Sequence, residues 1–459
     1  MSKKNLFASL LLGSILCQAQ TNPAVTSFLQ NTTVYGSYYT AATGGTPIKM
    51  SVLANCQQVR YSNDFVYINT TGVPAYPTGI FTGDGNKTLA GDQAAIYKIS
   101  LKPTKNLGTG TPTTSGNVGI FINGVSLFDY RDGVAWNNTT KALCGGPGNT
   151  ACPGGPTAVQ AWNRDAIPAE KLGFDCAKGH PAGTNYHHHQ NPSSFKYDAT
   201  TSISYSAICS IYDSEGLYTI DKTKHSPLIG FAYDGFPIYG AYGYANVNGT
   251  GAITRMKSSY QLKTATTRTN GPDVNSTYFN GYFKEDYEYA ARTSDATYLD
   301  ASNGRFCVTP EYPAGIYCYF ATVDANNSSV YPYVIGPTFY GNVTGAKVTS
   351  VAEATTTYTK PIVNTTTTTS ILDTKDTGLE VTIFPNPSND FIGLQIVGLN
   401  RENLKIELYD ATGKLVQKSM LNMGATNTYL DTRTLYAGAY VVKIIGNKST
   451  ITRSVVVEK

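Results

Sequence analysis

Short runs of alternating apolar and polar residues, each ended by a turn-forming dipeptide, recur along most of this chain. One run at residues 117–122 precedes Asn123-Gly124, and another at residues 229–233 precedes Asp234-Gly235. Alternation with period two predicts half-buried strands, and Asn-Gly or Asp-Gly between such runs predicts hairpin turns. The chain also holds 34 Tyr and 44 Gly, which suits strands and tight turns better than helices. The sequence therefore predicts a mainly β protein.

Composition divides the chain into four segments. Residues 1–19 have a charged start, an apolar stretch too short to span a membrane and small residues before Gln20, which predicts a secretory signal peptide. Residues 20–345 are expected to form one large β-rich domain, with a helix as the interpretation of residues 158–172. Residues 346–379 are rich in Thr and predict an extended linker. Residues 380–459 show clean period-two strands and predict a small C-terminal β-sandwich.

Charge and hydropathy limit the partners of the chain. The formal net charge is +4, and no basic run is dense enough to predict binding to nucleic acid. No stretch reaches the length of a transmembrane span, so we expect none. The chain also lacks a nucleophile elbow, a phosphate loop and a dinucleotide fingerprint, so no catalytic residue is predicted.

Eight cysteines bear on the stability of an exported chain, because export permits disulfides. Cys144 and Cys152 bracket a Gly-rich loop that a bridge would close. Cys307 and Cys318 flank a turn, so they can face each other across a hairpin. Cys176 is expected to be a buried disulfide partner. Cleavage after the signal peptide leaves an odd number of cysteines, so at least one is unpaired or pairs elsewhere.

All five histidines fall between His180 and His225, and three of them are consecutive. In an extended strand, His187 and His189 point to one face, with Cα atoms about 6.5–7 Å apart, while Tyr186 and His188 point to the other. Two imidazoles at that spacing can bind one metal ion. His225 is the expected third ligand and His180 a fourth candidate. Imidazole ligands favour zinc or copper.

Several interpretations of this histidine cluster stay open. Three ligands would leave a coordination position for water, and thus for hydrolysis or, with copper, redox chemistry. Whether the chain is an enzyme is undecided, and a metal-scavenging role fits as well. Asp234 and Tyr186 are candidates for hydrogen bonds that orient a metal-bound histidine. For Asp234, a hairpin turn is the preferred explanation. Asp213 and Glu215 are further candidate acids. The alternative is a cell-surface binding module for glycan or protein in which the histidines form a structural His–Tyr network.

The histidine region also resembles a known family. The run Tyr186-His187-His188-His189 is similar to the Tyr-His-Tyr-His run of the YHYH domain, with His188 in place of the second Tyr. The resemblance spans roughly residues 50–342, and it implies no established reaction. Other stretches that carry it lie at residues 175–181, 225–240, 304–313 and 331–337.

The C-terminal segment closely resembles the type A sorting domain of the bacterial type IX secretion system. The resemblance rests on Phe384-Pro385-Asn386-Pro387 and on residues 408–414 and 435–443. It implies that residues 380–459 engage the type IX secretion machinery. The expected location is therefore outside the cell, either secreted or on the outer-membrane surface.

Overall fold

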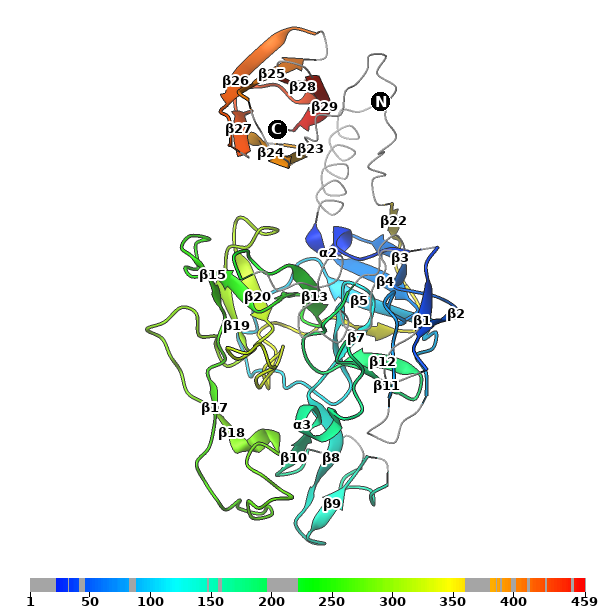
Figure 1. Cartoon of the computed structure of the whole chain (residues 1–459). Coiled ribbons are helices and arrows are strands. Elements are labelled where there is room, and N and C mark those ends of the chain that lie inside the picture. Colours follow the sequence, from blue (N-terminus) through cyan, green and yellow to red (C-terminus); the bar gives the residue numbers. More distant parts are fainter. Residues whose placement is uncertain are drawn as a thin grey trace, which may run out of the picture. The chain divides into compact units, whose positions relative to one another are not determined.

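The computed structural model of the chain describes most residues between 22 and 458, and nearly all of its regular secondary structure is strand (Figure 1). The described residues are 22–31, 33–40, 46–81, 88–146, 148–155, 159–195, 222–359 and 380–458, the last without 385, 389, 398–401, 411–412, 426 and 447–449. The chain forms two compact units, residues 1–361 and residues 362–459. The mainly β prediction is confirmed. The expected signal peptide lies outside the described residues.

An eight-stranded mixed sheet forms the centre of the first unit. Most neighbours are antiparallel, but β12 runs parallel to β7 and β14 runs parallel to β20. The hairpin β11–β12, which carries His180 and His187, forms one edge of this sheet. In spatial order the strands are β11 (His180–Ala182), β12 (Asn185–His188), β7 (Ser126–Phe128), β6 (Asn117–Phe121), β13 (Leu228–Ala232), β14 (Pro237–Tyr239), β20 (Ile316–Phe320) and β19 (Gly304–Cys307).

A five-stranded antiparallel sheet accompanies the eight-stranded one, and smaller sheets and short helices complete the unit. Its strands are β21 (Ala346–Val348), β5 (Ala95–Ser100), β4 (Phe65–Thr70), β3 (Cys56–Tyr61) and β22 (Thr356–Tyr358). A three-stranded sheet holds β10 (Asn163–Asp165), β8 (Arg131–Asn137) and β9 (Ala142–Cys144). The two-stranded sheets pair β1 (Tyr35–Tyr38) with β2 (Ile48–Leu53), β15 (Tyr242–Tyr244) with β16 (Ile253–Arg255), and β17 (Tyr260–Leu262) with β18 (Tyr287–Tyr289). The helices are α2 (Pro23–Thr26), α3 (Ala166–Glu170) and the 3-10 turn η1 (Lys284–Asp286).

One hydrophobic core joins the five-stranded and eight-stranded sheets. Ile68 and Tyr97 from the first sheet belong to the same buried cluster as Ile120 and Phe231 from the second. Side chains of this size each contribute about 1.5–3 kcal/mol when fully buried. The predicted strands at residues 117–122 and 229–233 are present as β6 and β13, but they are almost fully buried and not half-buried, because both lie in the middle of the eight-stranded sheet.

Buried tyrosines pair with buried carboxylates throughout this unit. The hydroxyl of Tyr319 donates to Asp234 at 2.6 Å, and that of Tyr333 donates to Asp165 at 2.6 Å. A buried hydroxyl or carboxylate without a partner costs free energy, so each pair satisfies two groups at once. Burial still raises the pKa of Asp165 to about 8 and that of Asp234 to about 6. The many tyrosines thus serve the core with their rings and the polar network with their hydroxyls.

Part of the segment predicted as a linker is folded. β21 pairs with β5, and β22 pairs with β3, so residues 346–358 contribute two edge strands to the five-stranded sheet. Thr and Tyr have high β-propensity, and an open sheet edge offers their backbone hydrogen-bond partners. Residues 360–379 lie outside the described residues.

The second unit consists of two antiparallel sheets around a core of its own. Leu394 and Leu430 of one sheet share an apolar cluster with Ile406, Leu408 and Val442 of the other, as expected for a small sandwich. The first sheet holds β23 (Glu380–Phe384), β24 (Phe391–Val397) and β27 (Asn427–Asp431). The second holds β26 (Leu415–Leu421), β25 (Leu404–Asp410), β28 (Gly438–Ile445) and β29 (Thr450–Val457).

The cysteines form fewer described bridges than their spacing allows. Cys144 and Cys152 are joined by a disulfide, and Cys176 is also disulfide-bonded. Cys307 and Cys318 lie on the neighbouring strands β19 and β20, but both are buried free thiols, as is Cys56. The thiols of Cys307 and Cys318 are hydrogen-bonded to each other. The hairpin was therefore predicted correctly, while the bridge across it is not formed in this structure.

Candidate metal centre

The β11–β12 hairpin brings His180 opposite His187. The two residues are directly paired in the antiparallel ladder, so their side chains project to the same face. The hairpin turns through Gly183-Thr184, and Gly183 has a φ of 61°, a left-handed conformation that glycine adopts without strain. Strand alternation then places His189 on the same face as His187. Local turn chemistry and strand geometry therefore converge three imidazoles.

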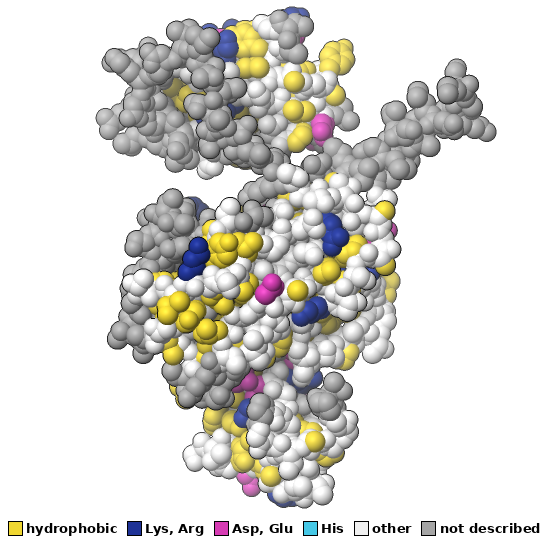
Figure 2. Space-filling view, turned by 90° about the vertical axis from the view of Figure 1, so that its right-hand side faces the viewer, with side chains coloured by type: hydrophobic (Ala, Val, Ile, Leu, Met, Phe, Trp, Pro, Cys, Tyr) yellow, Lys and Arg dark blue, Asp and Glu magenta, His cyan; other side chains and the backbone are white. Residues whose placement is uncertain are grey.

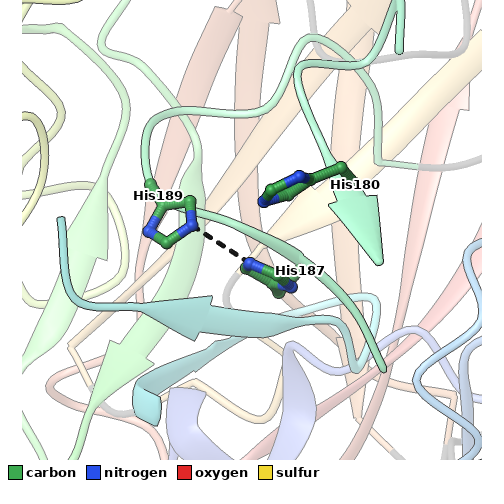
Figure 3. A group of neighbouring side chains, drawn as sticks. All are labelled: His180, His187 and His189. Carbon is green, nitrogen blue, oxygen red and sulfur yellow. Dashed lines mark hydrogen bonds between the residues drawn. The ribbon is translucent and has the colours of Figure 1, made fainter. Parts of the chain in front are cut away.

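Figure 3 shows the rings of His180, His187 and His189 turned towards one another. One nitrogen from each ring can be chosen so that all three lie within 4.8 Å of one another. Nε2 of His187 lies 3.0 Å from Nε2 of His189. All three residues are buried, with exposed fractions of 5%, 2% and 4% in sequence order. No histidine is visible on the face shown in Figure 2, where charged side chains are sparse.

Hydrogen bonds to the backbone fix which nitrogens of His187 and His189 face the centre. Nδ1 of His187 lies 3.0 Å from the carbonyl oxygen of Asn185, and Nδ1 of His189 lies 2.5 Å from that of Asp129. A carbonyl only accepts, so each Nδ1 carries a proton and donates it. In the neutral rings both Nε2 atoms then carry a lone pair, and the two lone pairs face each other. Metal-bound histidines use the same arrangement: one ring nitrogen binds the ion, and the other donates its N–H to a carbonyl or carboxylate oxygen.

Among the described residues, Glu170 is the acid whose carboxylate contacts these rings, and no sequence pattern pointed to it. Its Oε2 lies 3.3 Å from Nε2 of His180 and 3.3 Å from Nε2 of His189. Glu170 ends helix α3, which begins after Asp165, whose carboxylate accepts a hydrogen bond from the backbone N–H of Ile167 at 2.9 Å. That N-cap explains why the helix starts there. The helix is shorter than the predicted 158–172, because residues 163–165 form strand β10 instead.

Aromatic rings enclose the three histidines. Phe128 stacks on His187 with ring centroids 3.9 Å apart and an interplanar angle of 23°. Phe174 makes an edge contact with His180 at 4.8 Å. These rings exclude water from the imidazoles and lower the local dielectric, which strengthens every electrostatic interaction there.

The electrostatics of the centre favour a neutral imidazole at His187 and a charged carboxylate at Glu170. Burial lowers the pKa of His187 well below its usual range, and the neighbouring imidazoles of His189 and His180 lower it further. Burial alone would raise the pKa of Glu170, but the imidazoles of His180 and His189 hold it below its usual range. Neutral imidazole and ionised carboxylate are the forms that coordinate metal ions.

His188 and Tyr186 lie on the opposite face of β12, as strand alternation requires. The hydroxyl of Tyr186 donates to Asp175, with both carboxylate oxygens 2.9 Å away, and Nε2 of His188 lies 3.0 Å from the hydroxyl of Tyr76. Burial lowers the pKa of His188 to about 3. This face of the strand is a buried His–Tyr network, and among the described residues no group of three ligand atoms lies on it.

The structure places His225 and Asp234 away from the triad. His225 packs against Tyr239 and Tyr244, with ring centroids 5.1 Å away in each case, and its Nδ1 lies 2.7 Å from the carbonyl oxygen of Ser226. Asp234 accepts from Tyr319 and from the backbone of Gly341 beside the β13–β14 turn. His180 therefore takes the position that the sequence suggested for His225. Asp213 and Glu215 lie outside the described residues.

Comparisons with known proteins bear mainly on the second unit and on family membership. A secretion system C-terminal sorting domain matches residues 382–458, which identifies this unit as a type IX sorting domain and the chain as exported. No curated protein matches the chain. A crystal structure of dimeric latent PorU from Porphyromonas gingivalis is 18% identical over 17% of this chain and 9% of that chain. The TM-score is 0.15, which is too low to indicate a shared fold. No helix within the described ranges is long and apolar enough to cross a membrane.

The match that identifies the protein family lies in the first unit. The model described as YHYH protein matches residues 96–331, more than half of the chain. The match runs from β5 into the segment after β20, so it includes Glu170 and all three histidines of the triad. The resemblance seen in the sequence is thereby confirmed, and the chain belongs to the YHYH protein family.

Proposed function

We propose that the YHYH domain of this exported protein binds one zinc or copper ion through His180, His187 and His189. The proposal rests on the Nε2 atoms of His187 and His189, which lie 3.0 Å apart. The Nδ1 atom of each of these rings donates to a backbone carbonyl, so each Nε2 faces the centre of the site. Two lone pairs at that separation in a buried site repel each other unless a proton on one Nε2 or a metal cation lies between them, and a metal cation would also engage the third ring. Imidazole nitrogens suit zinc and copper best among the common ions.

The direct test is the metal content of the full exported chain, measured by mass spectrometry. The wild type should hold about one equivalent of zinc or copper, and a His187→Ala/His189→Ala variant should hold none. His225→Ala is the matched control, because it removes an imidazole from the same domain outside the triad. It should keep the ion. A metal-free wild type after reconstitution would contradict the proposal, and loss of the ion in His225→Ala would contradict this choice of ligands.

A second candidate function is the binding of a small glycan or peptide. A hollow of about 640 Å³ lies beside strand β8 and the loop closed by the Cys144–Cys152 disulfide. Arg131, Asn149 and Asn163 are among its lining residues, which offer hydrogen bonds to a polar ligand. A glycan array probed with the wild type and with the His187→Ala/His189→Ala variant tests this candidate. Binding by both would support a module independent of the metal, and binding by neither would count against it.

A further inference from the structure

The position of Glu170 decides how many protein ligands an ion in this centre would have. This step rests on the proposed metal site. A tetrahedral ion with bonds of about 2.0–2.1 Å places its ligand atoms about 3.3–3.4 Å apart, because the edge of a tetrahedron is about 1.63 times its radius. Oε2 of Glu170 lies 3.3 Å from two of the imidazole nitrogens. The carboxylate oxygen therefore lies at the distance of a fourth ligand.

A base acting through a metal-bound water would lie farther away. Such a water occupies the fourth vertex itself, and the base accepts its proton over about 2.6–3.2 Å from outside the coordination shell. Its oxygen would then be well beyond one tetrahedral edge from the imidazole nitrogens. The two 3.3 Å distances of Glu170 fit direct coordination better than this arrangement.

Charge balance points the same way. A buried divalent cation needs an anionic partner, because neutral imidazoles do not compensate its charge. The neighbouring Asp129 is already paired with Arg131 at 2.6 Å, and Asp132 is paired with Arg164. Oε2 of Glu170 is buried, and the partners it faces are the imidazoles of His180 and His189 themselves. Glu170 is thus the carboxylate that remains to face an ion.

We propose that Glu170 is the fourth ligand and that the centre is a closed site whose ion is structural. Three histidines alone would leave an open position, but four protein ligands leave none for a substrate. The ion would join the end of helix α3 to the β11–β12 hairpin. In Figure 1, α3 lies beside β8 and β10 at one end of the unit, so this link fastens that end to the edge of the eight-stranded sheet.

The affinity test compares Glu170→Gln with wild type on the full chain, by zinc titration against a chromophoric chelator. Loss of the carboxylate should weaken zinc binding by at least about 10–100-fold. Glu311→Gln is the matched control, because Glu311 is also half-buried, accepts from Tyr239 at 2.7 Å, and follows β19 at the opposite edge of the same sheet. Glu170→Asp, which keeps the charge on a shorter side chain, should fall between the wild type and Glu170→Gln.

A measurement on the wild type alone covers the case in which the variants do not fold. A closed ligand set leaves no water on the ion, so the Cu²⁺-loaded chain should not accelerate water proton relaxation beyond the level of a protein without an open site. Fast relaxation, or equal zinc affinity in Glu170→Gln and wild type, would overturn the closed site while leaving the histidine site intact. A wild type that binds neither zinc nor copper would refute the metal site itself.

Discussion

Acidification should destabilise the YHYH domain through His188, by an amount that follows from its buried position. Burial lowers the pKa of His188 to about 3, whereas an unfolded chain keeps it near 6.5. A folded-state pKa below the unfolded value means that the stabilisation is complete above about pH 6.5 and is lost as the pH falls towards 3. At pH 5 the gap is about 1.5 pH units, which at about 1.4 kcal/mol per unit removes about 2 kcal/mol of stability.

The assay compares urea unfolding of the wild type and His188→Gln at pH 7 and pH 5. Both proteins are first treated with a chelator, so that release of an ion does not contribute. The only two tryptophans, Trp136 and Trp162, lie in the first unit, so their fluorescence follows the unfolding of this unit alone. All other titratable groups are the same in both proteins, so their contributions cancel in the difference. The wild type should lose about 2 kcal/mol more than His188→Gln between the two pH values, and equal losses would refute the reasoning.

Two further predictions concern the polar network and the disulfide. Tyr319→Phe should destabilise the first unit by about 1–3 kcal/mol in urea unfolding, because it leaves the buried carboxylate of Asp234 without its hydroxyl donor; the more exposed Tyr289→Phe is the control, and an equal effect of both would argue against the pairing. A Cys144→Ser/Cys152→Ser variant should lose about 2–3 kcal/mol, the loop-closure value for a bridge that spans 8 residues; an unchanged urea midpoint would show that the loop is held by other contacts.

The sequence predicted those features that depend on local periodicity. Alternation at residues 117–122 and 229–233 was sufficient for β6 and β13, because side-chain direction in a strand depends only on position along it. The same rule predicts that His187 and His189 share one face, and it needs no knowledge of the β11–β12 hairpin. The Thr-rich segment was harder: its composition suggested a linker, but the edges of the five-stranded sheet offer backbone partners that composition does not reveal.

The remaining ligands depend on tertiary pairing, which periodicity does not determine. His180 faces His187 because the β11–β12 hairpin turns through Gly183-Thr184, and a shift of one residue in register would send it to the other face. His225 has the same chemistry, but it lies outside the strands and packs against Tyr239 and Tyr244. Glu170 is ten residues before His180 on a helix, so only the packing of α3 brings its carboxylate to the rings.

Anomalous scattering from crystals of the exported chain would locate an ion between His180, His187 and His189. Data collected at the zinc and copper edges should show a single strong peak about 2.0–2.1 Å from Nε2 of each of the three rings. A peak elsewhere, for example beside His225, or no peak in crystals grown with either metal, would contradict the proposed metal site.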